Sequence, residues 1–162
     1  MNVIIRLLDK VLSYALIAAM ASILLVVSWQ VISRYLLSDP SSVTEELARF
    51  LLIWIGMLGA VYAFRTHAHL GLDIVVDRMQ PAKKHLVQIF VQLSVIVFCA
   101  LVMVYGGAEL MELTLDLNQI SAALGIKMGF VYSILPITGG MICLYAIHNI
   151  GCILRGEEEG RH

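Results

Sequence analysis

The sequence predicts an all-α integral membrane protein, a single domain over residues 1–162 with four transmembrane helices. Two observations lead to this fold class. Hydrophobic residues make up 60% of the chain and charged residues 14%, whereas soluble domains average about 45–50% and about 25%. In addition, polar segments separate four stretches that contain no charged residue, namely residues 11–33, 50–64, 86–108 and 128–154. Each stretch predicts one membrane-spanning helix.

Three of these stretches are long enough by themselves, because about 20 helical residues cross the hydrocarbon layer. We predict helices over residues 11–33, 85–110 and 128–154. The apolar part of the first stretch is far longer than the roughly 7–15 residues of a signal peptide, so we expect it to be retained. In the last helix Pro136 predicts a kink whose freed carbonyl is satisfied by neighbouring groups.

The second stretch is too short to cross the membrane alone. Residues 50–64 rise only about 22 Å at about 1.5 Å each, against roughly 30 Å of hydrocarbon. The helix must therefore continue through charged residues, and we predict that it covers residues 45–66. Ser42 and Glu45 have the spacing of a capping box, which predicts the start of the helix.

One face of this second helix is small in its middle and polar at both ends. Because small residues let helix backbones approach closely in lipid, we predict that this face is a subunit interface. When successive residues are placed 100° apart around the helix axis, the residues on this face are Glu46, Arg49, Ile53, Gly56, Ala60, Ala63 and His67. The opposite side carries Trp54, Leu58, Val61 and Arg65.

The charges of this helix have two interpretations, both open at this point. In the first, Glu45 or Glu46 forms an ion pair with Arg49 on the same helix, and the side chains extend to the lipid headgroups. In the second, Glu46 and Arg49 form ion pairs with another helix of the bundle or with another subunit. For Arg65, at the opposite end, we expect the side chain to extend to the headgroups.

The helix ends in "RTHAHLGLD", which places two histidines close together. His67 and His69 point about 160° apart on a helix and cannot share a metal ion. We therefore expect a polar helix end, followed over residues 70–80 by an amphipathic segment that lies on the phospholipid of the inner leaflet.

Motifs for nucleotide binding, hydrolysis and metal-dependent catalysis are absent from the sequence, so we predict no catalytic, substrate-binding or metal residue and no cofactor. The net charge of −1 argues against nucleic acid. Residues 11–33 contain no acidic side chain, which counts against a small proton-coupled exporter. His148 keeps a second interpretation open, a haem-bearing anchor subunit of a respiratory or other enzyme complex. A self-sufficient small transporter is a third.

Two polar groups mark the third helix. Gln88 and Gln92 share one face and are expected to form interhelical hydrogen bonds. Glu109, Glu112 and Asp116 share a face at the far end, which is either solvated or a negative docking surface for an extracytoplasmic partner.

The distribution of basic residues predicts the orientation, because loops rich in Lys and Arg stay in the cytoplasm. The two ends of the chain and the loop between helices two and three carry Arg6, Lys10, Arg65, Arg78, Lys83, Lys84, Arg155 and Arg161. The other two loops carry Arg34, Arg49 and Lys127. Both termini are therefore expected on the cytoplasmic side of the inner membrane.

Residues 45–73, "EELARFLLIWIGMLGAVYAFRTHAHLGLD", resemble the second-helix signature of the small membrane subunit of TRAP transporters, the DctQ-like family. In this family an acidic residue and an arginine precede a Trp-containing, Gly- and Ala-rich helix that ends in Arg and His. The matching positions are Glu46, Arg49, Trp54, Gly56, Gly59, Arg65 and His69. Residues 121–140 are similar to the family's entry into helix four, although Ala123 and Lys127 stand where prolines are frequent.

The resemblance implies a supporting role in sodium-coupled uptake of an organic acid, such as a C4-dicarboxylate or a sialic acid. TRAP systems combine a periplasmic substrate-binding protein, a large elevator-type membrane subunit and this small subunit. Substrate and sodium are then expected to bind the large subunit, with the small subunit extending its fixed scaffold.

Overall fold

Four long helices make up the fold. In the computed structural model, the described residues are 2–36, 41–66 and 81–155, and all regular elements among them are helical. Four runs are long and apolar enough to cross a membrane: Ile5–Tyr35, Ser42–Arg65, Leu86–Asp116 and Met128–Leu154. The predicted fold class is therefore confirmed.

The first two helices begin earlier than the charge-free stretches. Helix α1 runs over Asn2–Tyr35 and α2 over Ser42–Arg65. The N-cap of α2 is Ser41, whose hydroxyl accepts a hydrogen bond from Thr44 N at 3.5 Å, so the predicted capping box of Ser42 and Glu45 is wrong by one residue. Since α1 starts at Asn2, it also includes Asp9.

The third span is one continuous rod of three segments. Helix α4 covers Pro81–Phe98, a π-helical segment η1 covers Cys99–Gly106, and α5 covers Gly107–Asp116. Pro81 occupies the first position of α4, where its missing N–H is tolerated. After α5 the chain turns at Asn118, which takes the left-handed conformation (φ 47°) that commonly ends a helix.

The fourth span is broken near its start. Helix α6 covers Met128–Tyr132 and α7 covers Ile134–Arg155, with a turn at Ser133 between them. Pro136 falls in the first turn of α7, where no intrahelical donor is required. The break therefore lies just before the proline.

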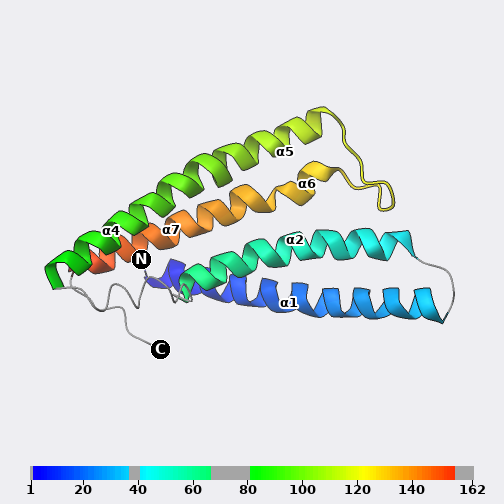
Figure 1. Ribbon diagram of the computed structural model, residues 1–162, viewed down its shortest axis with the longest axis horizontal. Helices are drawn as coiled ribbons and strands as arrows, with labels where there is room; N and C mark the ends of the chain where they lie inside the picture. Colours follow the sequence, from blue (N-terminus) through cyan, green and yellow to red (C-terminus); the bar gives the residue numbers. More distant parts are fainter. Residues whose placement is uncertain (1, 37–40, 67–80, 156–162) are drawn as a thin grey trace.

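The helices pack side by side as an open layer. Contacts join α1 to α2, α2 to α7, and α7 to α4 and η1. In Figure 1 the α1–α2 pair and the α4–α7 pair converge where α1 begins and α7 ends, hereafter the termini end. They diverge toward the other end, where residues 117–127 reach back toward α2 (the loop end). Much of every helix stays exposed.

A small apolar core lies between the helices. Its fully buried members are Leu12 from α1, Val61 from α2, and Ile134 and Tyr145 from α7. Cys99 of η1 belongs to the same cluster. The core therefore draws one to three side chains from each span, and many large apolar side chains face outward, as expected in lipid.

Glycines allow the third and fourth spans to approach closely. A Cβ atom on Gly139 would lie 2.6 Å from Met103 Cβ, and one on Gly107 would lie 2.9 Å from Leu135 Cβ. Gly129 meets Leu115 in the same way, at 2.5 Å. Because dispersion contacts replace the hydrophobic effect as the force between helices in lipid, these three contacts stabilise the pair.

Gly139→Ala is expected to weaken this contact. Relative to Gly140→Ala, where nothing lies within 4 Å of the new Cβ, it should lower the free energy of unfolding by about 1–3 kcal/mol. Both changes gain the same helix propensity, so the difference in apparent melting midpoint in detergent reports packing alone. Equal midpoints for the two variants would contradict the close approach.

Candidate functional site: the polar contacts and exposed face of α2

Helix α2 is the part of the layer that holds the two helix pairs together. It packs against α1 on one side and α7 on the other. Polar side chains of α2 also make hydrogen bonds to other segments at three depths, through Glu46 at the loop end, Trp54 in the middle and Arg65 at the termini end.

At the loop end Glu46 holds the segment between α5 and α6. Its Oε2 atom accepts hydrogen bonds from Ala123 N at 2.8 Å and Leu124 N at 3.1 Å. Ser121 Oγ also accepts from Leu124 N, at 3.2 Å. Glu46 therefore acts within this chain. Neither interpretation predicted these partners, which are backbone amides of the non-helical segment between α5 and α6 and not a charged side chain.

Arg49 makes the local pair. Its Nη2 lies 3.6 Å from Glu45 Oε1, one helical turn earlier, and the two side chains are 68% and 59% exposed. Exposed pairs of this kind contribute less than about 1 kcal/mol. The guanidinium is therefore weakly held and faces outward.

In the middle of the layer Trp54 bridges α2 to α6. Its indole N–H donates to the Val131 carbonyl oxygen at 3.2 Å. Val131 lies in the last turn of α6, next to the break that precedes Pro136, where helix hydrogen bonding is interrupted. A neighbouring side chain thus satisfies a carbonyl beside the break. The carbonyl that Pro136 would free is that of Tyr132, four residues earlier, so the neighbour expected for it stays a prediction.

At the termini end three helices meet in one polar cluster. Arg65 Nε donates to Asp9 Oδ1 at 3.1 Å, and Tyr145 Oη donates to the same oxygen at 2.8 Å. The guanidinium also lies over the Tyr145 ring, 5.7 Å from its centre. Charge-assisted hydrogen bonds of this geometry are about twice as strong as neutral ones. The cluster therefore joins α1, α2 and α7.

This cluster corrects two expectations. Arg65 does not simply extend to the headgroups, because its side chain is 29% exposed and pairs with an acid 33% exposed. The first helix does contain an acidic residue, Asp9, and the argument against an exporter from an acid-free first helix is wrong. Asp9 is, however, already engaged by two donors.

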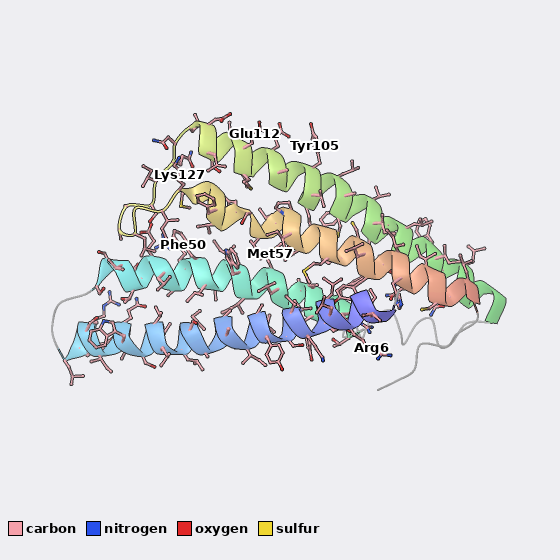
Figure 2. The ribbon with its side chains drawn as sticks, turned by 180° about the vertical axis from the view of Figure 1, so that it is seen from behind. Arg6, Phe50, Met57, Tyr105, Glu112 and Lys127 are labelled. Atoms are coloured by element: carbon pink, nitrogen blue, oxygen red, sulfur yellow. The ribbon has the colours of Figure 1, made fainter. Side chains whose placement is uncertain are left out.

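The predicted interface stripe divides into an exposed centre and half-buried margins. Arg49, Gly56 and Ala60 are exposed, and a Cβ on Gly56 would meet nothing within 4 Å. The margins, half-buried against the rest of the chain, are Glu46, Ile53 and Ala63. On the opposite side of α2, Leu58 and Val61 are buried, and Figure 2 shows Met57 directed toward α6 and α7. The small centre of the stripe is therefore not covered by any of the residues that the structure describes.

The acidic face of the third span lies on α5. Glu109, Glu112 and Asp116 are all exposed, and Figure 2 shows Glu112 on the outer side of α5, away from α6. No part of the described chain covers these carboxylates.

The histidines give no metal site among the described residues, where no group of three potential ligands is found. His67, His69 and the predicted segment 70–80 lie outside the described residues. His148 is half-buried, and its ring nitrogens lie 3.9 Å from Cys152 Sγ on the same helix.

Sequence reasoning missed Asp9 and Tyr145. Asp9 lies outside the charge-free stretch that defined the first helix, and Tyr145 has no polar neighbour in sequence. A signal existed in Asp9 itself, the single acid among the first 38 residues. A lone carboxylate on a membrane helix calls for a cation on a neighbouring one.

Comparison with known proteins identifies the family. The model of the DctQ component of tripartite ATP-independent periplasmic (TRAP) transporters matches residues 23–156. The chain belongs to the DctQ family. It is therefore a small membrane subunit of a TRAP transporter, a multi-pass protein of the inner membrane and not an enzyme, which excludes the anchor-subunit alternative.

Individual relatives agree with this assignment. A TRAP transporter small permease protein of Haemophilus influenzae is 27% identical over 154 residues, covering 93% of this chain and 94% of the relative. The sialic acid TRAP transporter small permease protein SiaQ of Vibrio cholerae is 26% identical over 62% of this chain and 58% of its own. The isethionate TRAP transporter permease protein DctMQ of Oleidesulfovibrio alaskensis is 26% identical over 83% of this chain but only 22% of its own length.

The DctQ-like motif positions separate into two groups in space. Glu46, Trp54 and Arg65 make the three contacts that hold the layer. Arg49 and Gly56 point outward from it. The signature therefore combines residues that hold this chain together with residues whose surface no part of the described chain covers.

Removing the shared acceptor of the termini-end cluster is expected to destabilise the protein. Asp9→Ala and Tyr145→Phe should each lower the free energy of unfolding by about 1–3 kcal/mol, and the double variant by less than the sum, because both remove the hydrogen bond between Tyr145 and Asp9. Melting in detergent measures this. Tyr14→Phe, on the same helix and 71% exposed, is the control and should be neutral; additive losses would contradict the shared contact.

Glu46→Ala is expected to release residues 121–124. Hydrogen bonds to a carboxylate are stronger than those to a neutral acceptor, so the amides of Ala123 and Leu124 should exchange with deuterium several-fold faster when Glu46 is removed. Hydrogen–deuterium exchange read by mass spectrometry checks this. Glu45→Ala removes the adjacent carboxylate, which pairs within α2, and should leave the exchange unchanged; equal acceleration in both variants would show a general loosening instead.

Proposed function

We propose that this DctQ subunit braces the large membrane subunit of its TRAP transporter by docking the exposed stripe of α2 against it. The observation that carries the proposal is the unoccupied centre of that stripe, Arg49, Gly56 and Ala60. Small residues permit close helix contact and an outward arginine offers a charge to a partner. Family membership supplies the kind of partner.

The open layer supports this role. A closed bundle would bury its helix faces against one another, whereas this layer leaves broad apolar surfaces on every span. An elevator-type transporter moves one domain against a fixed one, so the fixed part gains from width and from firm seating in the bilayer. A layer of four helices, linked across α2 by polar contacts, is suited to that mechanical task.

Pairing with a large subunit is also supported by the isethionate permease of the comparison. Its matching region is 22% of a longer chain, so in that protein a DctQ-like segment is covalently joined to other permease sequence. In this transporter we infer a heterodimer of separate chains, seated in phospholipid and served by a periplasmic substrate-binding protein.

The proposed orientation places the termini end in the cytoplasm. In the sequence, eight of the eleven basic residues belong to the two chain ends and the connection between the second and third spans, and Arg34, Arg49 and Lys127 belong to the other two connections. The exposed acids of α5 then face the periplasm, where they offer a negative docking surface to the binding protein. The substrate we propose is an organic anion, taken up together with sodium that binds the large subunit.

Gly56→Leu and Ala60→Leu are expected to impair assembly. Each fills the unoccupied stripe without displacing an atom of this chain at position 56, so the yield of large subunit that co-purifies should fall by roughly fivefold or more, about 1 kcal/mol of association. Ala100→Leu, an exposed small residue of η1, is the matched control and should co-purify normally.

Transport decides whether the brace is needed. Liposomes with the large subunit and binding protein should take up substrate at full rate only when this chain is present, and more slowly with the Gly56→Leu variant. Full uptake by the large subunit alone would refute the proposed role. Uptake by liposomes that contain only this chain would show a self-sufficient transporter instead.

A further inference from the structure

Two buried amide oxygens on α4 and α7 lack a hydrogen-bond donor. They are Gln92 Oε1 and Asn149 Oδ1, and of the buried side-chain oxygens and nitrogens in the described residues they alone are unpartnered. Asn149 is only 3% exposed. A buried carbonyl oxygen without a donor is costly, and more so in a membrane, where no bulk water is near. Each of the two therefore calls for an explanation.

The antiparallel packing of α4 and α7 places the two side chains at nearly the same depth. Cys143 Sγ of α7 lies 3.8 Å from the Ile96 carbonyl oxygen of α4, which sets the register. From that contact toward the termini end, Gln92 is four residues away, or about 6 Å, and Asn149 is six residues away, or about 9 Å. The two amides are thus within about 3 Å of one level.

Both side chains also lie on the faces that pack together. Cys99 is buried, and Gln92 lies seven residues before it, two turns away on the same face of α4. On α7 the buried residues Ile142, Ala146 and Asn149 follow one another along one stripe. The two unpartnered oxygens therefore share the junction where α4 and α7 meet.

The missing donor has to be small. Both oxygens are closed off from the surface, so a partner side chain or lipid headgroup cannot reach them. The neighbouring polar side chain, His148, has its ring nitrogens near Cys152. A water molecule has two O–H donors, one for each oxygen, and is small enough for such a junction.

We propose that one water molecule is bound between Gln92 and Asn149 and donates one hydrogen bond to each. It is a polar link between the third span and α7, at the termini half of the pair. Toward the loop end, Gly107, Gly129 and Gly139 allow the close contacts that hold the third span against the fourth. The inference concerns this chain alone and does not depend on the proposed partner.

The sign of a stability change tests the proposal. If the oxygens share a water, Gln92→Met and Asn149→Leu should each lower the apparent melting midpoint in detergent by about 3–8 °C, because each leaves the other oxygen without its donor. The double variant should melt no lower than the less stable single variant. Gln88→Met, one turn earlier on α4, is the matched control and should change the midpoint little.

Two outcomes would overturn the proposal. If the oxygens are independent and truly unpaired, each apolar replacement should raise the midpoint, and the two effects should add. If the amides bond directly, a high-resolution map of the assembled complex should show an amide nitrogen of one within 3.5 Å of the oxygen of the other. Density for a single water between the two oxygens would support the proposal.

Discussion

The structure depends on the weakness of the hydrophobic effect between helices in lipid. Apolar side chains gain little by leaving acyl chains for one another, so helix association has to come from close backbone contact and from hydrogen bonds. This chain uses both. Glycines join the third span to the fourth. Glu46 and Trp54 of α2 join the α1–α2 pair to the segment between α5 and α6 and to α6, and the hydrogen bond from Tyr145 to Asp9 joins the pair to α7.

The three contacts of α2 differ in chemistry because their surroundings differ. At the loop end a carboxylate holds backbone amides of an irregular segment. In the middle, where charge would be costly, a neutral indole N–H satisfies one carbonyl. At the termini end a full ion pair is supported by a tyrosine hydroxyl.

An open layer held in this way serves assembly better than chemistry. Asp9, Glu46, Trp54, Arg65 and Tyr145 are already engaged in contacts within the layer, and the described residues hold no cluster of potential metal ligands. Its exposed surfaces are largely apolar along the spans, with charged side chains gathered toward the helix ends. These properties are those of a subunit that supports a transporting partner, in keeping with membership of the DctQ family.

Part of the candidate site was predictable from the sequence. The helical period of α2 separated the buried Leu58 and Val61 from the exposed Gly56 and Ala60, because a 100° step assigns faces without knowledge of the partner. The roles of Arg65 and Glu46 were not predictable in the same way. A charged residue at a helix end has several stable solutions, namely headgroup contact, local pairing or a distant partner, and only geometry selects one.

The sequence by itself determined the number of spans and the faces of α2, because the length and period of apolar runs report the solvent around a helix. The family was indicated by the resemblance of residues 45–73 to a known motif. The tertiary structure alone decided which polar groups meet. Asp9 is 56 residues from Arg65 and 136 from Tyr145, and Glu46 is 77 from Ala123. Such pairings depend on how helices converge and rotate, and hydropathy carries no information about either.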